Sequence, residues 1–170
     1  MGSQIESKIG RRFGVQSILV AALCLAAGTT AQAQSSHASP HCRPVGGTVM
    51  TNFVDSNTTL GSATGDLEGA VSATLLGVAP AADGTTVFSV QHHWTTDTGD
   101  SIFFAVAQAS ALPVAQGLFA IVSYPVTITG GTGKFAGAVG TVENIGEVDL
   151  NTLRTVFRYQ GEVCLQTPSK

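Results

Sequence analysis

The sequence has 170 residues, with 8 Lys and Arg against 11 Asp and Glu, and a formal net charge of −3 at pH 7. The few basic residues are scattered, which argues against nucleic acid and anionic membranes as partners. A chain of this length has room for one domain whose core is large enough to fold without a metal.

The first 33 residues have the pattern of a secretory signal peptide. Lys8, Arg11 and Arg12 precede an apolar run at residues 15–27, and a small-residue cleavage site ends at Ala33. The apolar run is too short to span a bilayer, and no later segment approaches about 20 unbroken apolar residues. We therefore expect a secreted or periplasmic protein without membrane anchoring, whose mature chain carries five Lys and Arg against ten Asp and Glu.

After a flexible polar leader at residues 34–43, the chain consists of short runs rich in β-branched and aromatic residues. Turn signals containing Gly, Asp or Asn separate these runs, and helical periodicity is nearly absent. The links are short, which favours antiparallel neighbours because a parallel pair needs a long crossover. The expected strands, about eight in number, are 47–54, 58–65, 69–78, 85–95, 100–109, 118–128, 136–148 and 152–164. Eight such strands can form a barrel or a sandwich, and the pattern does not decide between them.

Two cysteines remain after the expected cleavage, Cys42 and Cys164. Disulfides persist in exported proteins, so we expect these two residues to be bonded to each other. Two separate thiols are the alternative. On the chain-entropy model, closing a loop of this length contributes roughly 4–5 kcal/mol to stability.

The last expected strand alternates most clearly between apolar and polar residues. Leu153, Thr155, Phe157, Tyr159 and Val163 face one way, and Arg154, Arg158, Gln160 and Glu162 face the other. One face is therefore expected in the core and the other in water. Residues 101–106, SIFFAV, instead carry apolar side chains on both faces. Exposed apolar area of that kind often marks an interface, which leaves a homo-oligomer open.

The stretch 127–140, TITGGTGKFAGAVG, contains the glycine spacing of a dinucleotide-binding loop. Such a site needs a long helix after the glycines to hold the pyrophosphate. Residues 137–146 contain three glycines and four β-branched residues, which makes a helix unfavourable. A phosphate-binding loop is also excluded, because Lys134 is followed by Phe135 in place of Ser or Thr.

A structural turn is the favoured interpretation of this stretch. At least one of Gly130, Gly131 and Gly133 is expected at a positive φ angle, with Phe135 packed under a loop that joins two strands. The run 128–140 resembles the glycine turn shared by dirigent proteins and allene oxide cyclases. In that superfamily it joins two strands of an eight-stranded antiparallel barrel through a short helical turn.

The resemblance extends over residues 44–165, which look like secreted bacterial proteins described as allene oxide cyclase barrel-like. His93 and Trp94 precede a GDSI run at residues 99–102, and YQGEVC at residues 159–164 closes the last strand. The resemblance implies an all-β domain over 44–165, an eight-stranded antiparallel β-barrel of the allene oxide cyclase and dirigent type, with a C-terminal tail at 166–170.

Plant allene oxide cyclases isomerise an unstable fatty-acid epoxide inside an apolar barrel, using a buried glutamate. Glu68, Glu143, Glu147 and Glu162 are the glutamates of the mature chain, and none lies in a motif that transfers this role. We therefore expect a barrel that binds a small, largely apolar molecule in its interior. An isomerase or cyclase acting on such a molecule is one alternative, and a structural or interaction protein with a filled barrel is another.

The expected site residues follow from the strands that would line the barrel. His92 and His93 are adjacent on a strand, so they point to opposite faces and cannot both ligate one metal. No metal and no cofactor is expected, and catalytic residues stay unassigned. The residues expected to bind the ligand are His93, Trp94, Phe104, Phe157 and Tyr159.

Overall fold

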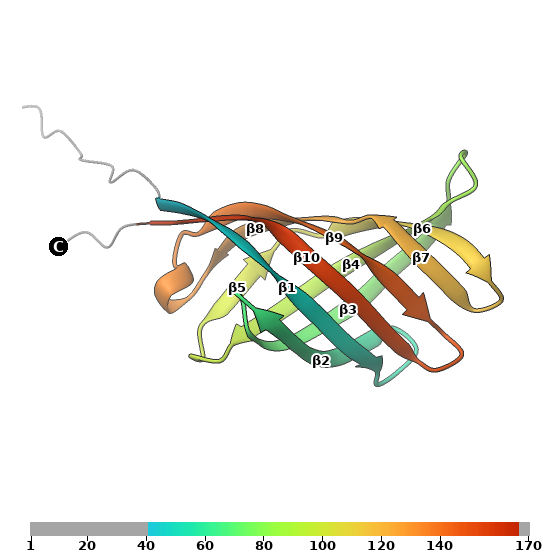
Figure 1. The fold of residues 1–170 in the computed structure, drawn as a ribbon, viewed down its shortest axis with the longest axis horizontal. Coiled ribbons are helices and arrows are strands. Elements are labelled where there is room, and N and C mark those ends of the chain that lie inside the picture. Colours follow the sequence, from blue (N-terminus) through green and yellow to red (C-terminus); the bar gives the residue numbers. More distant parts are fainter. Residues whose placement is uncertain (1–40, 167–170) are drawn as a thin grey trace, which may run out of the picture. The chain divides into compact units, whose positions relative to one another are not determined.

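The computed structural model of the chain describes residues 41–166 (Figure 1). Its elements are β1 (His41–Phe53), β2 (Thr58–Gly65), β3 (Gly69–Pro80), β4 (Thr86–Thr96), β5 (Ser101–Phe104), β6 (Ala107–Ala115), β7 (Leu118–Ser123), β8 (Pro125–Gly131), the 3-10 helix η1 (Gly133–Phe135), β9 (Val139–Asp149) and β10 (Arg154–Leu165). Residues 41–43 of the expected leader belong to β1. The predicted signal peptide, residues 1–33, lies outside the described residues.

The strands close into an antiparallel barrel with eight positions around its wall. Pairing of β10 with both β1 and β9 joins the first strand to the last. Two positions each hold two consecutive strands: β5 continues into β6, and β7 into β8. β4 accordingly pairs with β6 along one half and with β5 along the other, and β9 does the same with β7 and β8. The prediction of an eight-stranded antiparallel barrel is confirmed.

The two split positions change which residues face inward. Ile102 and Phe104 are buried in β5, but Ala107, Ala109 and Ala111 are the buried residues of β6, so the inward side changes from even to odd numbers. A break or bulge in a strand produces this shift, because the side chains alternate with a period of two. The expected strands 100–109 and 118–128 are therefore each two strands.

The last strand has the predicted alternation, with one correction. Thr155, Tyr159 and Val163 are buried, and Arg158 is exposed. Leu153 was expected on the inner face, but it precedes β10, has a φ of 57° and is 53% exposed. Its carbonyl accepts a hydrogen bond from the backbone N–H of Phe53, so it forms the β9–β10 turn instead of the core.

One end of the barrel interior is packed with side chains, and we call it the filled end. Its members, each at most 5% exposed, are Val45, Leu67, Ile102, Ile128, Phe135, Ala138, Tyr159 and Val163. Leu67 lies in the β2–β3 turn, and its backbone N–H donates to the Tyr159 hydroxyl at 3.0 Å. The Trp94 indole N–H donates to the Leu67 carbonyl at 2.8 Å. These bonds hold the turn as a plug inside the barrel.

Tyr159 fits at the filled end because a glycine faces it. A Cβ atom on Gly47 would lie 2.6 Å from the Tyr159 hydroxyl oxygen, too close for any other residue. The Tyr159 hydroxyl also donates to the carbonyl of Thr64 at 3.0 Å. Its polar atom is thus satisfied by backbone groups, as burial requires.

The glycine turn between β8 and β9 has the positive φ angles that the sequence predicts. Gly133 has a φ of 51°, and a Cβ atom there would collide with the Asp100 carboxylate. Gly133 begins the helix η1, and Phe135, its last residue, is 1% exposed. Figure 1 shows this turn at the end of the barrel where β1 begins. The short helical turn expected from the sequence is confirmed.

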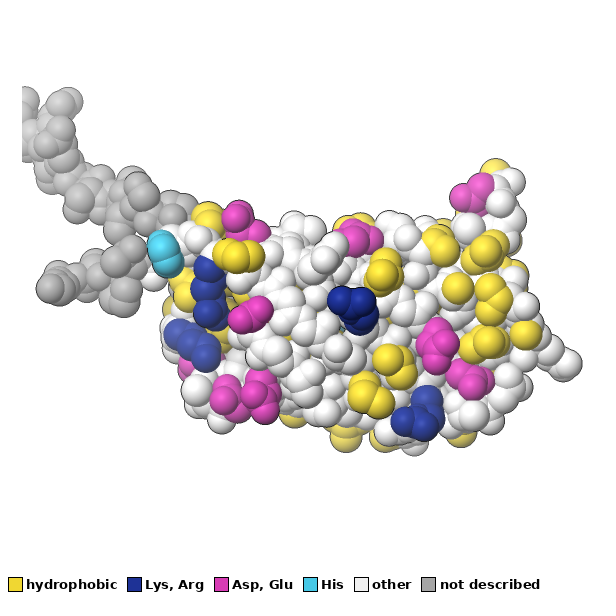
Figure 2. Space-filling view, viewed as in Figure 1, with side chains coloured by type: hydrophobic (Ala, Val, Ile, Leu, Met, Phe, Trp, Pro, Cys, Tyr) yellow, Lys and Arg dark blue, Asp and Glu magenta, His cyan; other side chains and the backbone are white. Residues whose placement is uncertain are grey.

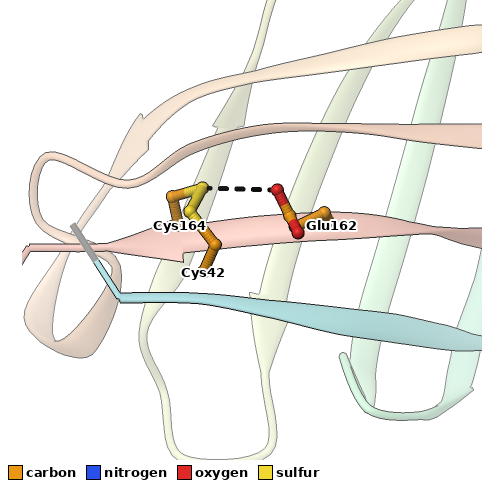
Figure 3. The surroundings of a disulfide bond; sticks show 3 residues. All are labelled: Cys42, Glu162 and Cys164. Carbon is orange, nitrogen blue, oxygen red and sulfur yellow. Dashed lines mark hydrogen bonds between the residues drawn. A yellow bond between two sulfur atoms is a disulfide. The ribbon is translucent and has the colours of Figure 1, made fainter.

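The Cys42–Cys164 disulfide is confirmed and lies at the start of β1 and the end of β10 (Figure 3). The two residues face each other directly in the β1–β10 register, and their Cα atoms are 3.8 Å apart. Glu162 lies beside the bond, with a carboxylate oxygen 3.7 Å from Cys164 Sγ. A bonded sulfur has no proton to donate, so this contact is not a hydrogen bond.

The outer face of the barrel mixes apolar and charged side chains (Figure 2). Phe103 and Val106, from the run that is apolar on both faces, are each 50% exposed. Such area fits the homo-oligomer that the sequence left open, and that expectation stays a prediction. Within residues 41–166, no helix has the length and apolar character needed to cross a membrane.

Candidate functional site

The other end of the barrel interior is a cavity of about 490 Å³, and we call it the hollow end. Every position of the barrel wall contributes side chains to it. Val71, Phe104 and Val142 lie at its inner limit, and Phe88 and Phe119 lie nearer the turns at the far end of the strands. The described residues that line it include no Asp, Glu, Lys or Arg. The hollow end is therefore an apolar pocket, in contrast to the packed core of the filled end.

Three of the five expected binding residues line this cavity: Trp94, Phe104 and Phe157. Trp94 also borders the filled end, where its ring meets that of Tyr159 edge to face with centroids 5.6 Å apart. Tyr159 itself is not among the lining residues, because its ring lies below the cavity floor and its hydroxyl is bound to backbone groups.

The placement of the two adjacent histidines needs correction. His93 was expected at the binding site, but its side chain is exposed on the outer face. His92 lines the cavity instead. Residues two apart on a strand share a face, so the inward position of Trp94 brings His92 inward and turns His93 outward.

A histidine and a tyrosine form a hydrogen-bonded pair in the cavity wall. The Tyr124 hydroxyl oxygen lies 2.7 Å from Nε2 of His92. Their rings are 5.5 Å apart, and Phe104 packs edge to face on His92 at 5.8 Å. Phe157 lies 5.8 Å from the Tyr124 ring on the other side. The pair is thus a polar element enclosed by aromatic side chains.

Tyr124 reaches this position because the barrel wall is interrupted at its own residue, between β7 and β8. Its backbone N–H donates to the side-chain carboxylate of Glu143 on β9, at 2.7 Å, instead of to a backbone carbonyl. Its carbonyl accepts from the Asn144 backbone N–H at 3.1 Å and from the Asn144 side-chain amide at 3.0 Å. Glu143 and Asn144 therefore replace the missing ladder bonds and hold Tyr124 inward.

A second interruption lies at the same level of the wall, between β5 and β6. The side-chain amide of Gln91 donates to the carbonyls of Phe104 and His92, at 3.1 and 3.2 Å. These bonds span the stretch of β4 between its pairing with β6 and its pairing with β5. Bulges and breaks are frequent beside functional sites, where they redirect side chains.

Burial sets the protonation of the pair. It lowers the pKa of His92 to about 4, with a smaller contribution from the neighbouring His93. Burial also raises the pKa of the Tyr124 hydroxyl above its usual range. At neutral pH, His92 is therefore neutral and Tyr124 is protonated, so the cavity wall carries no net charge.

Several of the other polar side chains in the wall are satisfied by neighbours. The hydroxyls of Thr51 and Thr155 hydrogen-bond to each other at 2.8 Å, across the β1–β10 pairing. In contrast, Nδ1 of His92 is buried and has no hydrogen-bond partner among the described residues. Within the described residues, His92 is thus a polar group of the site that is incompletely paired.

Sequence reasoning missed Tyr124, Asn144 and the inward role of His92. Tyr124 lies inside a run that the pattern presents as one strand, so the alternation from Phe119 and Ile121 would place it outward. The dipeptide Tyr124–Pro125 was the available signal, because proline interrupts strand pairing.

The comparisons with known proteins identify no family. No family model matches the chain, and no curated protein matches it. Among solved structures, the pterocarpan synthase dirigent protein GePTS1 is similar at 15% identity and a TM-score of 0.34, over 78% of this chain and 89% of that one. The pterocarpan synthase dirigent protein PsPTS1 is similar at 16% identity and a TM-score of 0.33, over 76% and 99%. No conclusion about this chain rests on scores of that size, and its fold is established by its own strand pairings.

Proposed function

We propose that the protein is secreted and binds a small, largely apolar molecule in the hollow end of its barrel. The observation that carries the proposal is the cavity of about 490 Å³, whose described lining holds no Asp, Glu, Lys or Arg. Small-molecule sites are typically concave, mainly apolar and of about 300–1,000 Å³. The disulfide supports the secreted location, because such bonds persist in oxidising compartments.

The apolar wall alone favours weak affinity, with a dissociation constant of roughly 1 mM. Removing about 200 Å² of a ligand's apolar surface from water contributes roughly 5 kcal/mol to binding. The cost of the ligand's lost translational and rotational freedom must be subtracted from this value. A dissociation constant near 1 mM corresponds to about 4 kcal/mol. Affinity beyond this range requires close packing against the aromatic side chains or a polar anchor.

A second candidate function, an isomerase or cyclase, is favoured by one observation. The Tyr124 hydroxyl and His92 form a donor and acceptor pair inside the cavity, which is the arrangement needed to move a proton to or from a bound molecule. The described lining has no carboxylate for the role that the allene oxide cyclase resemblance implies. Binding is therefore the primary proposal.

The test is a titration with a neutral, environment-sensitive apolar dye. Ala109 is 2% exposed and lines the cavity, so Ala109→Phe should fill part of it and weaken dye binding at least about tenfold. Ala70→Phe is the matched control, because Ala70 is exposed on the outer face of β3. Equal dye binding by the wild type and both variants would refute the proposal.

A further inference from the structure

We infer that Tyr124 is the hydrogen-bond anchor of the cavity, and that the ligand is a neutral molecule with one acceptor oxygen, such as a carbonyl, on a largely apolar body. This inference rests on the proposed function, because it specifies the class of molecule that the same cavity takes. Among the described lining residues, Tyr124 and His92 are the only titratable ones. The direction of the hydrogen bond between them decides what they offer a ligand.

The surroundings of His92 assign its proton to Nε2. A neutral imidazole carries one N–H, on either Nδ1 or Nε2. A proton on Nδ1 would be a buried N–H without an acceptor, since Nδ1 has no partner among the described residues. In the other tautomer the donor without a protein partner is the Tyr124 O–H, and Tyr124 lines the cavity, where water or a ligand can accept from it. With the proton on Nε2, His92 donates to the Tyr124 hydroxyl oxygen, 2.7 Å away.

This direction leaves the hydrogen of the Tyr124 hydroxyl available. The hydroxyl oxygen accepts from His92, and within residues 41–166 no second partner bonds to this hydroxyl. A buried hydroxyl without an acceptor is costly, and a ligand oxygen that supplies one removes the cost. The site therefore selects for an acceptor at the level of Tyr124.

The charge of the wall selects for a neutral ligand. A buried carboxylate needs a cation or several donors, and the described lining contains no Lys or Arg. His92 does not substitute for them, because burial keeps it uncharged at neutral pH. A fatty acid would consequently leave its head group outside the cavity, whereas a ketone or aldehyde can enter whole.

The rings around Tyr124 place the remainder of the ligand. Phe157 and the His92 ring flank Tyr124 at 5.8 and 5.5 Å. Further along the cavity, Phe88 and Phe119 pack against each other with centroids 5.5 Å apart. The apolar body would extend from Tyr124 toward these two phenylalanines.

Two naphthalene probes of nearly equal shape test the inference. Acetylnaphthalene carries a carbonyl, and ethylnaphthalene, substituted at the same ring position, does not. Tyr124→Phe, which removes only the hydroxyl, should raise the Kd of acetylnaphthalene about threefold to tenfold and change that of ethylnaphthalene less than about twofold. Tyr159→Phe, which removes a hydroxyl outside the cavity, should leave the ratio of the two constants unchanged.

The outcomes separate this inference from the proposed function. Saturable ethylnaphthalene binding together with equal effects of Tyr124→Phe on both probes would overturn the anchor and keep the binding function. Absence of binding by both probes would overturn both. Naphthoate, which carries a carboxylate, should bind more weakly than either neutral probe, and tighter binding would contradict the assigned ligand class.

Discussion

At the filled end of the barrel, Leu67 and Phe135 occupy the interior, and each is 1% exposed. At the hollow end, the same barrel wall encloses about 490 Å³. The strands do not account for this difference, because β10 supplies inward side chains to both ends. The connecting segments do: the β2–β3 turn and η1 insert large side chains at one end. At the other end, the turns contribute Ser56, Asn57 and Leu150 to the lining, and Leu150 is 45% exposed and does not fill the interior.

Truncating a large side chain at the filled end should have the largest effect on stability. Phe135→Ala removes a ring that is 1% exposed and leaves a cavity, so we expect a loss of about 3–5 kcal/mol in the free energy of unfolding. Phe119→Ala at the hollow end should cost less than about 2 kcal/mol, because that ring already borders empty space. Urea unfolding of both variants measures the difference. Equal losses would mean that the two ends are packed alike.

Removal of the disulfide should destabilise the barrel without altering the cavity. Replacement of Cys42 and Cys164 by Ser should lower the free energy of unfolding by about 2–5 kcal/mol, since the bond closes a loop across a sequence separation of 122. The bond lies at the filled end, so the Kd of the apolar dye should stay within about twofold of the wild type. Lost dye binding in a variant that remains folded would show that the two ends are coupled.

Acid should destabilise the hollow end through His92. Burial lowers its pKa to about 4 in the folded state, from 6.5. The unfolded chain therefore binds more protons between these values, and stability falls as the pH drops from about 6.5 to about 4, by up to about 3 kcal/mol. The contribution is fully present above pH 6.5. Urea midpoints across this range measure the loss.

Substituting each of the two histidines in turn shows which one causes this pH dependence of stability. His92→Leu should reduce the loss of stability between pH 6.5 and pH 4, because no buried imidazole remains to be protonated. His93→Leu is the control, since His93 is exposed on the outer face. An equal pH dependence in the wild type and the His92 variant would contradict the buried position of His92.

Substitution of two neighbouring residues on β10, Phe157 and Arg158, should have the smallest effects, and the two effects should differ in kind. Phe157 lines the cavity, so Phe157→Ala should weaken binding of the apolar dye about threefold to tenfold. Arg158 is exposed on the opposite face, and Arg158→Ala should change stability by less than about 1 kcal/mol and leave dye binding unchanged. A loss of stability from Arg158→Ala that exceeds the loss from Phe157→Ala would mean that the two faces of β10 are assigned the wrong way round.

The sequence predicts the strands better than it predicts the site, although the residue pattern alone leaves a barrel and a sandwich open. Hairpin-length links and alternating residues determine the strands, and the glycine turn with buried Phe135 follows from local chemistry. The inward position of Tyr124 does not, because it depends on a break that reverses the alternation after Ile121. The hollow interior is also not visible in the sequence, since the pattern does not reveal whether a turn such as the one carrying Leu67 enters the barrel.

The most direct test of the account is to map a bound apolar probe by methyl NMR on the wild-type protein. On titration with ethylnaphthalene, saturable shifts should appear at lining methyl groups such as those of Val90 and Ile121. The methyl groups of Ile102 and Val163 at the filled end should shift little. Shifts confined to exposed residues such as Val122, or no saturable shifts, would contradict a binding cavity inside the barrel.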